Sequence, residues 1–124
     1  MNDRVVLSEE YVADEALACT PTLTLRVNEQ GADQFALLFK ALSHPVRVQM
    51  LDLIAQGGGQ LCGCDIEYHF KLTQPTISHH LKVLRDARLI VSEARGVSVY
   101  HRIHQAVFAE AQAFLAHIAG SERA

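Results

Sequence analysis

Two cysteines separated by one residue carry the most specific chemistry in this sequence. Cys62-Gly63-Cys64 places two thiols close together, and thiolates bind soft or borderline centres such as Zn, Cd, Cu(I) and trivalent arsenic or antimony. Both sulfur atoms can reach one ion only where the backbone is not yet regular helix, which Gly63 at a helix start permits. A helix N-terminus favours thiolate, whereas the carboxylates of Asp65 and Glu67 oppose it. The alternative is that both cysteines are buried and act as small hydrophobic residues.

Basic residues are distributed unevenly along the chain. The net charge of the 124 residues is -3, which by itself argues against nucleic-acid binding. Residues 1–30, however, carry six acidic and two basic side chains, whereas residues 71–102 carry six basic and two acidic ones. The positive charge is therefore local, and its location suggests a surface that binds nucleic acid.

The elements that must position these residues follow from the apolar spacing. Apolar residues at helical spacing predict helices over 35–42 and 45–57 and a shorter one over 61–70. A fourth helix is predicted to begin after Thr73 as N-cap, with Ile77, Leu81 and Leu84 on one apolar stripe. Segments 89–93 and 97–103 are rich in β-branched residues and predict a β-hairpin, and residues 105–119 return to helical spacing. The fold class expected is mainly α with a β-hairpin wing, in the order α-α-α-α-β-β-α. This is a winged helix-turn-helix, in which the second helix of the pair enters the major groove of DNA.

The exposed side of the helix that follows Thr73 and the hairpin tip supply the expected DNA contacts. Gln74 can make a bidentate contact with adenine, and Ser78 and His79 can donate hydrogen bonds to bases or phosphates. Arg95, beside a glycine at the hairpin tip, can enter a narrow minor groove. The alternative is that the basic residues only solvate an exposed helix face. The expected DNA-binding residues are Thr73, Gln74, Thr76, Ser78, His79, Lys82 and Arg95.

Three runs of residues, in this order and spacing, resemble the ArsR/SmtB family of metal-responsive repressors, in its arsenic-responsive branch. They are Phe39–Arg47, Leu61–Asp65 and Gln74–Leu84, and the resemblance from Phe39 to Ile103 covers about half of the chain. It implies a homodimeric winged-helix repressor that binds a palindromic operator without inducer and releases it when the inducer binds. The first and last helices would form the dimer interface, in agreement with the wide apolar stripe over residues 107–118.

The resemblance also implies a ligand set. Cys62 and Cys64 stand where thiolate sensors of the family carry theirs, and Cys19 resembles an arm cysteine that some members fold across the dimer onto the partner's helix-turn-helix. Three thiolates without a fourth suit As(III) or Sb(III), whereas Cd or Pb usually recruits a fourth cysteine. The expected site is therefore Cys19, Cys62 and Cys64, with As(III) or Sb(III) as inducer and no cofactor required for DNA binding. Whether Cys19 binds within its own subunit or across the dimer stays open. The alternative that Cys19 is an ordinary thiol of the arm and not a ligand also stays open.

A second metal site of the family, on the last helix, is not expected in this chain. Its ligand pattern is broken at Gln105 and Val107, and Gly120 stands at the third place after His117. His101, His104 and His117 are therefore expected at interfaces or exposed rather than on zinc.

The sequence also permits functions other than a metalloid-responsive repressor. A sensor of Cd, Pb or Zn, or a thiol-redox sensor using Cys62 and Cys64, would have the same fold. A thiol enzyme such as an arsenate or disulfide reductase is disfavoured, because the sequence has no CxxC, βαβ pattern or phosphate loop. No small organic substrate is expected.

The chain is expected to have two parts. Residues 1–30 are expected to form an N-terminal arm that carries a metalloid ligand. Residues 31–120 are expected to form the winged helix-turn-helix domain for DNA binding and dimerisation. Three cysteines are too few for a disulfide framework, and no signal peptide or apolar run of about 18 residues is present. The expectation is a cytoplasmic protein with reduced thiols and no membrane insertion.

Overall fold

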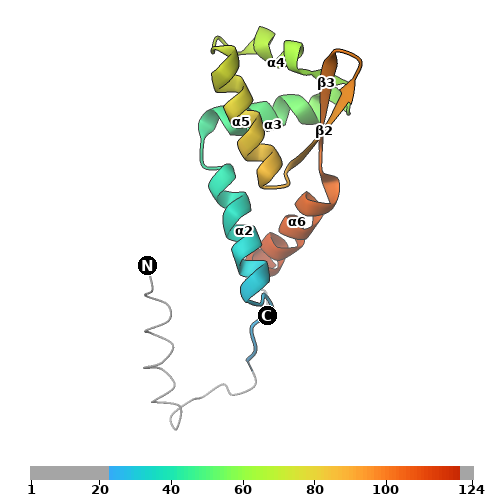
Figure 1. Cartoon of the computed structure of the whole chain (residues 1–124). Helices are drawn as coiled ribbons and strands as arrows, with labels where there is room; N and C mark the ends of the chain where they lie inside the picture. Colours follow the sequence, from blue (N-terminus) through green and yellow to red (C-terminus); the bar gives the residue numbers. More distant parts are fainter. Residues whose placement is uncertain (1–22, 121–124) are drawn as a thin grey trace.

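A three-stranded antiparallel sheet packs among five helices in the computed structural model, which describes residues 23–120 (Figure 1). The predicted mainly α fold with a hairpin wing is confirmed. One short strand, β1, precedes the third of these helices and is additional to the predicted order. The elements are α2 Glu29–Ala41, α3 Pro45–Gly57, β1 Leu61–Cys62, α4 Gly63–His69, α5 Gln74–Asp86, β2 Ile90–Arg95, β3 Ser98–Ile103 and α6 Gln105–Gly120.

Side-chain caps fix where three helices begin. The Asn28 side chain accepts a hydrogen bond from the Gly31 backbone N–H at 2.8 Å, so α2 starts at Glu29, ahead of the apolar pattern. His44 Nδ1 accepts from the Val46 N–H at 3.2 Å at the start of α3. At α5 the predicted N-cap Thr73 accepts from the Thr76 N–H at 3.4 Å, so the start of this helix is confirmed.

The sheet joins the wing to the segment that carries the cysteines. Its strand order is β1-β3-β2, with Leu61 opposite His101 and Cys62 opposite Tyr100. The hairpin β2–β3 pairs from Ile90↔Ile103 to Arg95↔Ser98. Gly96 turns the hairpin with a φ of 64°, a conformation that favours glycine. The wing is therefore fixed at its base by backbone hydrogen bonds to β1.

A single buried cluster connects the helices to the base of the wing. The predicted stripe of α5, Ile77, Leu81 and Leu84, lies in this cluster and holds α5 against the rest of the domain. Because that stripe is buried, the opposite side of α5 faces solvent. The largest fully buried side chains are Met50, Ile54, Ile66, Ile77, Leu84 and Leu89.

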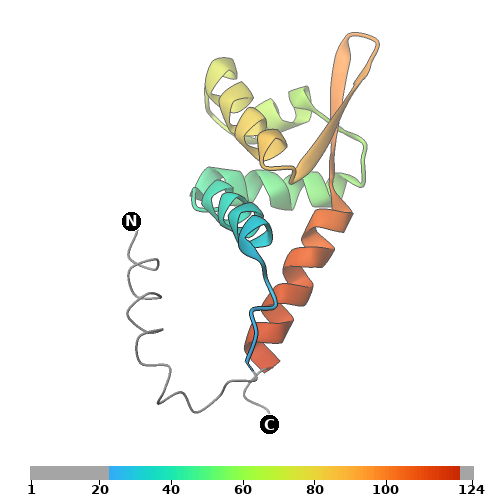
Figure 2. The same ribbon diagram turned by 60° about the horizontal axis from the view of Figure 1, so that its bottom comes forward.

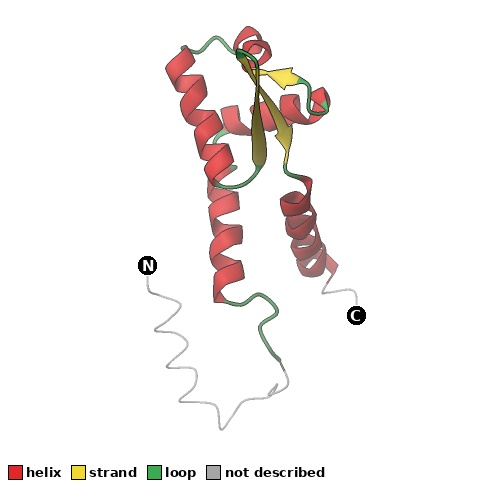
Figure 3. Ribbon diagram, turned by 45° about the vertical axis from the view of Figure 1, so that its right-hand side comes forward, coloured by secondary structure: helices red, strands yellow, loops and turns green. Residues whose placement is uncertain are grey.

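Helices α2 and α6 project to one side, away from the wing (Figures 1 and 3). Figure 2 shows α6 leaving the foot of the wing directly after β3. The rings of Phe35 and Phe114 stack at 4.8 Å and join the two helices. Leu37 and Leu115 nevertheless remain 51% and 50% exposed. Within residues 23–120, no helix combines the length and apolar character needed to cross a bilayer.

The packing of α5 predicts the cost of emptying its buried side. Leu84→Ala should lower the free energy of unfolding by about 2–5 kcal/mol, because Leu84 is 0% exposed and its removal leaves a cavity. Leu25→Ala, at a side chain that is 91% exposed, is the matched control and should change it by less than about 0.5 kcal/mol. Urea denaturation followed by circular dichroism measures both, and equal effects would contradict this account of the core.

Candidate functional site

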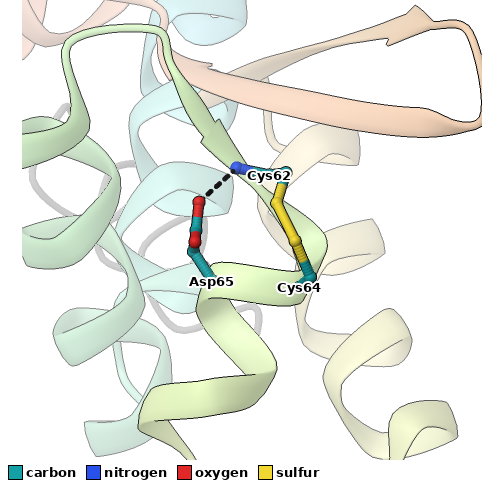
Figure 4. Close-up of a disulfide and its surroundings, with 3 residues drawn as sticks. All are labelled: Cys62, Cys64 and Asp65. Carbon is teal, nitrogen blue, oxygen red and sulfur yellow. Dashed lines mark hydrogen bonds between the residues drawn. A yellow bond between two sulfur atoms is a disulfide. The ribbon is translucent and has the colours of Figure 1, made fainter.

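Cys62 and Cys64 lie at the junction of β1 and α4 and are joined by a disulfide (Figure 4). Cys62 has extended backbone, with φ -93° and ψ 168°, and Gly63 begins α4. This brings the two Cα atoms to 5.3 Å, within the range in which disulfides form. The structure thus differs from the expectation of reduced thiols. The sulfur atoms converge because Cys62 is extended, and a positive φ at Gly63 is not needed.

Asp65 is the third potential ligand beside the two sulfur atoms. Its Oδ2 accepts a hydrogen bond from the Cys62 N–H at 3.1 Å (Figure 4). One ligand atom from each of Cys62, Cys64 and Asp65 lies within 4.8 Å of the others, the one such group found within residues 23–120. Sequence reasoning treated Asp65 only as a charge that opposes the thiolates. The signal it missed is the three-residue spacing between an N-cap and a carboxylate that reaches back to it.

Cys19, the third sulfur of the predicted site, lies outside the described residues. Its place in the site therefore stays a prediction. Among the described histidines, His69 and His117 are exposed, whereas His104 Nδ1 accepts from the Val107 N–H at 3.4 Å near the start of α6.

A groove of about 370 Å³ connects the cysteine pair to the exposed side of α5. One wall is the start of α4, a second is α5, and the third is the outer part of the wing. The cysteines and the α5 side chains that were predicted to read DNA therefore border the same space. The residues lining it include Cys62, Cys64, Glu67, Gln74, Ser78, Arg85, Val97 and His101.

Six of the seven predicted DNA-binding residues lie together at α5. Gln74 Nε2 donates to Ser78 Oγ at 2.9 Å, which orients the amide that was predicted to contact adenine. Lys82 forms an exposed ion pair with Asp86 at 2.8 Å. This hydrogen bond from Lys82 lowers the pKa of Asp86. The six are Thr73, Gln74, Thr76, Ser78, His79 and Lys82, and all are exposed.

Arg95, the seventh residue, is held against the wing and the loop before β1. Its guanidinium donates to the Gly59 carbonyl at 3.4 Å and to Gln60 Oε1 at 3.3 Å. It also pairs with Glu93 and lies 4.4 Å above the Tyr100 ring. A contact with the minor groove would therefore require Arg95 to exchange these partners for phosphates or bases.

A partly buried network behind α5 connects it to the turn between α2 and α3. Arg47 Nε donates to the Ala41 carbonyl at 2.7 Å, and Arg47 Nη1 lies 3.2 Å from His80 Nδ1. Because arginine only donates, His80 Nδ1 must be the unprotonated acceptor. Burial, followed by the charges of His44, Arg47 and His79, lowers the pKa of His80. Sequence reasoning missed this contact because its partners are 33 positions apart.

His101 is the second buried histidine, at the base of the wing. Its Nδ1 is hydrogen-bonded to Ser92 Oγ at 2.9 Å across the hairpin. Burial, with a smaller effect of Arg85, lowers the pKa of His101. Both buried histidines are therefore neutral parts of the fold near pH 7.

These two pKa values predict how stability depends on pH. Below about pH 6.5 the unfolded chain binds protons at both histidines while the folded protein resists them. The free energy of unfolding should therefore fall as the pH is lowered from 7 towards 5. His80→Gln should make this fall shallower, whereas His117→Gln, at an exposed site, is the matched control. Urea denaturation across this pH range measures the slopes, and an unchanged slope in His80→Gln would refute the assignment.

Comparison with known proteins shows the family of this chain. The family model described as "Bacterial regulatory protein, arsR family" matches residues 44–92. The arsenical resistance operon repressor of Staphylococcus xylosus is 41% identical over 51% of this chain and 59% of that protein. The transcriptional repressor SdpR of Bacillus subtilis (strain 168) is 39% identical over 56% of this chain and 76% of that protein. The chain thus spans less than two thirds of the first relative and about three quarters of the second.

A solved structure agrees with the sequence match. The homodimeric winged helix-turn-helix DNA-binding domain of a possible ArsR-family transcriptional regulator from Mycobacterium bovis superposes with a TM-score of 0.59. It is 27% identical and covers 81% of this chain and 93% of that one. The predicted winged helix-turn-helix fold and the resemblance noted in the sequence are both confirmed. The chain belongs to the ArsR family of bacterial regulatory proteins.

Proposed function

We propose that this protein is a transcriptional repressor that binds a two-fold-symmetric operator as a homodimer and releases it when As(III) or Sb(III) binds Cys62 and Cys64. The observation that carries the proposal is the shared groove. The two sulfur atoms border the same space as Gln74 and Ser78 of α5, so a ligand at the sulfurs acts next to the side chains that meet DNA. The protein would work in the cytoplasm, on DNA and without an enzymatic activity.

The DNA-binding step is supported by the exposed surface of α5. Buried apolar residues hold one side of this helix, which leaves the amide and hydroxyl groups of Gln74, Thr76 and Ser78 on the exposed side, where they can reach base edges. The positive net charge of residues 71–102 attracts phosphates at the same surface. Each subunit would read one half-site, and two recognition helices one helical turn apart require a dimer.

The dimer is supported by the apolar surface of α2 and α6. Leu37 on α2 and Leu115 on α6 are half exposed on the part of the domain that projects away from the wing. A second copy covering these helices would remove that surface from water. The Mycobacterium bovis relative is described as homodimeric, and the resemblance of the sequence to its family implies the same arrangement here.

The metalloid is supported by the chemistry of the donors. Two thiolates are soft ligands that trivalent arsenic and antimony accept, and the Staphylococcus xylosus relative is named for arsenical resistance. Cys19 on the arm would supply the third thiolate. The domain boundary proposed with it is an arm over residues 1–30 and a DNA-binding and dimerisation domain over 31–120.

A sensor of Cd, Pb or Zn is the second candidate, and Asp65 favours it. A carboxylate beside two thiolates suits a borderline divalent ion better than As(III), and a carboxylate oxygen of Asp65 lies within 4.8 Å of both sulfur atoms. Parallel titrations with Cd, Pb and Zn in the release assay below separate the two candidates.

Gln74 provides the test of DNA reading. Gln74→Ala should weaken binding to an operator selected from a random DNA pool by about 1–3 kcal/mol, because it removes a bidentate base contact. Binding to unrelated DNA should be nearly unchanged. Gln56→Ala on α3, whose amide contacts Asp52 at 3.2 Å, is the matched control. Fluorescence anisotropy at several salt concentrations measures both, and an equal loss on operator and unrelated DNA would remove Gln74 from base reading.

Cys64 provides the test of the inducer site. Cys64→Ser should fold and bind operator, because a hydroxyl replaces an exposed thiol at a helix start, but arsenite should no longer release the DNA. The assay needs a phosphine reductant, since dithiols bind arsenite themselves. Release from Cys64→Ser at the arsenite concentration that releases the parent protein would overturn the proposed site. Cys19→Ser in the same assay decides whether the arm supplies a ligand.

A further inference from the structure

We propose that the Cys62–Cys64 disulfide is a redox gate on the inducer site: the oxidised repressor keeps its operator but cannot respond to the metalloid. This inference rests on the proposed function. It differs from a redox sensor in which oxidation itself releases DNA. Here oxidation leaves DNA binding intact and removes only the response to the inducer.

The disulfide is compatible with the arrangement that reads DNA. With the sulfur atoms bonded, Cys62 still pairs with Tyr100 in the sheet and its N–H still donates to Asp65. Ile66 of α4 remains 0% exposed, so this helix keeps its place in the core. Gln74 and Ser78 remain hydrogen-bonded on the exposed side of α5. The disulfide-bonded state therefore has α5 in the arrangement that is expected to read DNA.

The same bond removes the ligands that the metalloid needs. Arsenite binds a thiol by exchanging a hydroxyl group for sulfur, with the thiol proton leaving in the water that is released. A disulfide sulfur has neither a proton nor a negative charge to exchange, so only the Asp65 carboxylate remains at this end of the site. A hard carboxylate alone is a poor ligand for As(III). The oxidised pair is therefore closed to the inducer.

The oxidation and reduction steps balance with ordinary cellular reagents. Two thiols and one hydrogen peroxide molecule give the disulfide and two water molecules. In the reverse direction, the thiolate of a low-molecular-weight thiol attacks Cys64 Sγ, and the S–S bond breaks with Cys62 leaving as thiolate. A second reductant thiolate then attacks the reductant's own sulfur in the mixed disulfide. This releases the reductant as its disulfide and leaves Cys64 as thiolate, and both cysteines recover protons from water.

The difference in exposure between the two cysteines directs the reductant to Cys64, and a groove gives the reductant room to enter. Cys62 is 7% exposed, whereas Cys64 is exposed. The groove of about 370 Å³ opens on the pair, and Arg85 in its lining supplies a positive charge for an anionic thiol. The pair is therefore accessible from the surface in the folded protein, and opening the gate does not require unfolding.

The experiment compares oxidised and reduced full-length protein in the same operator assay. The protein is treated with peroxide or with a phosphine, the reagent is removed, and peptide mass mapping locates the disulfide. Operator affinity should agree within about threefold between the two forms, whereas the arsenite concentration for half-release should rise at least about tenfold on oxidation. Adding glutathione to the oxidised form, followed by its removal, should restore the response.

The possible results distinguish failure of the redox gate from failure of the inducer site. Operator release on oxidation alone, arsenite release at equal concentrations from both forms, or a disulfide that involves Cys19 would overturn the gate and leave the proposed inducer site standing. A reduced protein that binds operator but ignores arsenite would overturn the inducer proposal and the gate with it. The measurement on the reduced protein thus tests the proposed function, and the comparison of the oxidised with the reduced protein tests the gate.

Discussion

The pairing of β1 with β3 is the contact on which the geometry of the site depends. Two residues of β1 are hydrogen-bonded to the strand that forms one side of the wing, and the second of them is Cys62. The next residue begins α4, which leads directly into α5. Arg95 adds a second connection, because it joins the wing to Gly59 and Gln60 immediately before β1. The two-residue strand β1 therefore fixes the wing, the cysteine pair and α5 relative to one another.

The sequence was sufficient for most of the fold and for part of the site. Helices α3, α5 and α6 follow from apolar spacing and caps, and the hairpin follows from β-branched residues around Gly96. Strand β1 could not be predicted, because two residues have no period and its partner lies about 40 positions away. The same reason hid the contact between Arg47 and His80. Arg95 was recognised as functional, but its contacts depend on how the wing packs.

Under the proposed function, local charge matters more than net charge for DNA binding. Two of the basic side chains, Lys82 and Arg95, are paired with Asp86 and Glu93. The Lys82–Asp86 pair is largely exposed, and exposed ion pairs contribute only about 0–1 kcal/mol, so a DNA phosphate could replace Asp86 at little cost. Arg95 would in addition have to give up its contacts with Gly59, Gln60 and Tyr100. Neither ion pair by itself would prevent Lys82 or Arg95 from binding a phosphate.

Disulfide formation and metalloid binding differ in how far they act beyond the cysteine pair. This difference explains how one proposed site can bind the inducer and also be closed by oxidation. The disulfide joins residues that the fold already holds with Cα atoms 5.3 Å apart, so the bond makes no demand on the rest of the molecule. A metalloid shared with a thiolate from the arm would instead pull on the start of α4 from outside the domain. Helix α4 has seven residues and buries one of them, Ile66, so it resists such a pull weakly. Helix α5 follows it after a short turn, and in a dimer both copies of α5 must fit the operator together. Under the proposed function, a metalloid that also bound the arm would displace α4 and oppose DNA binding, whereas the disulfide alone would not.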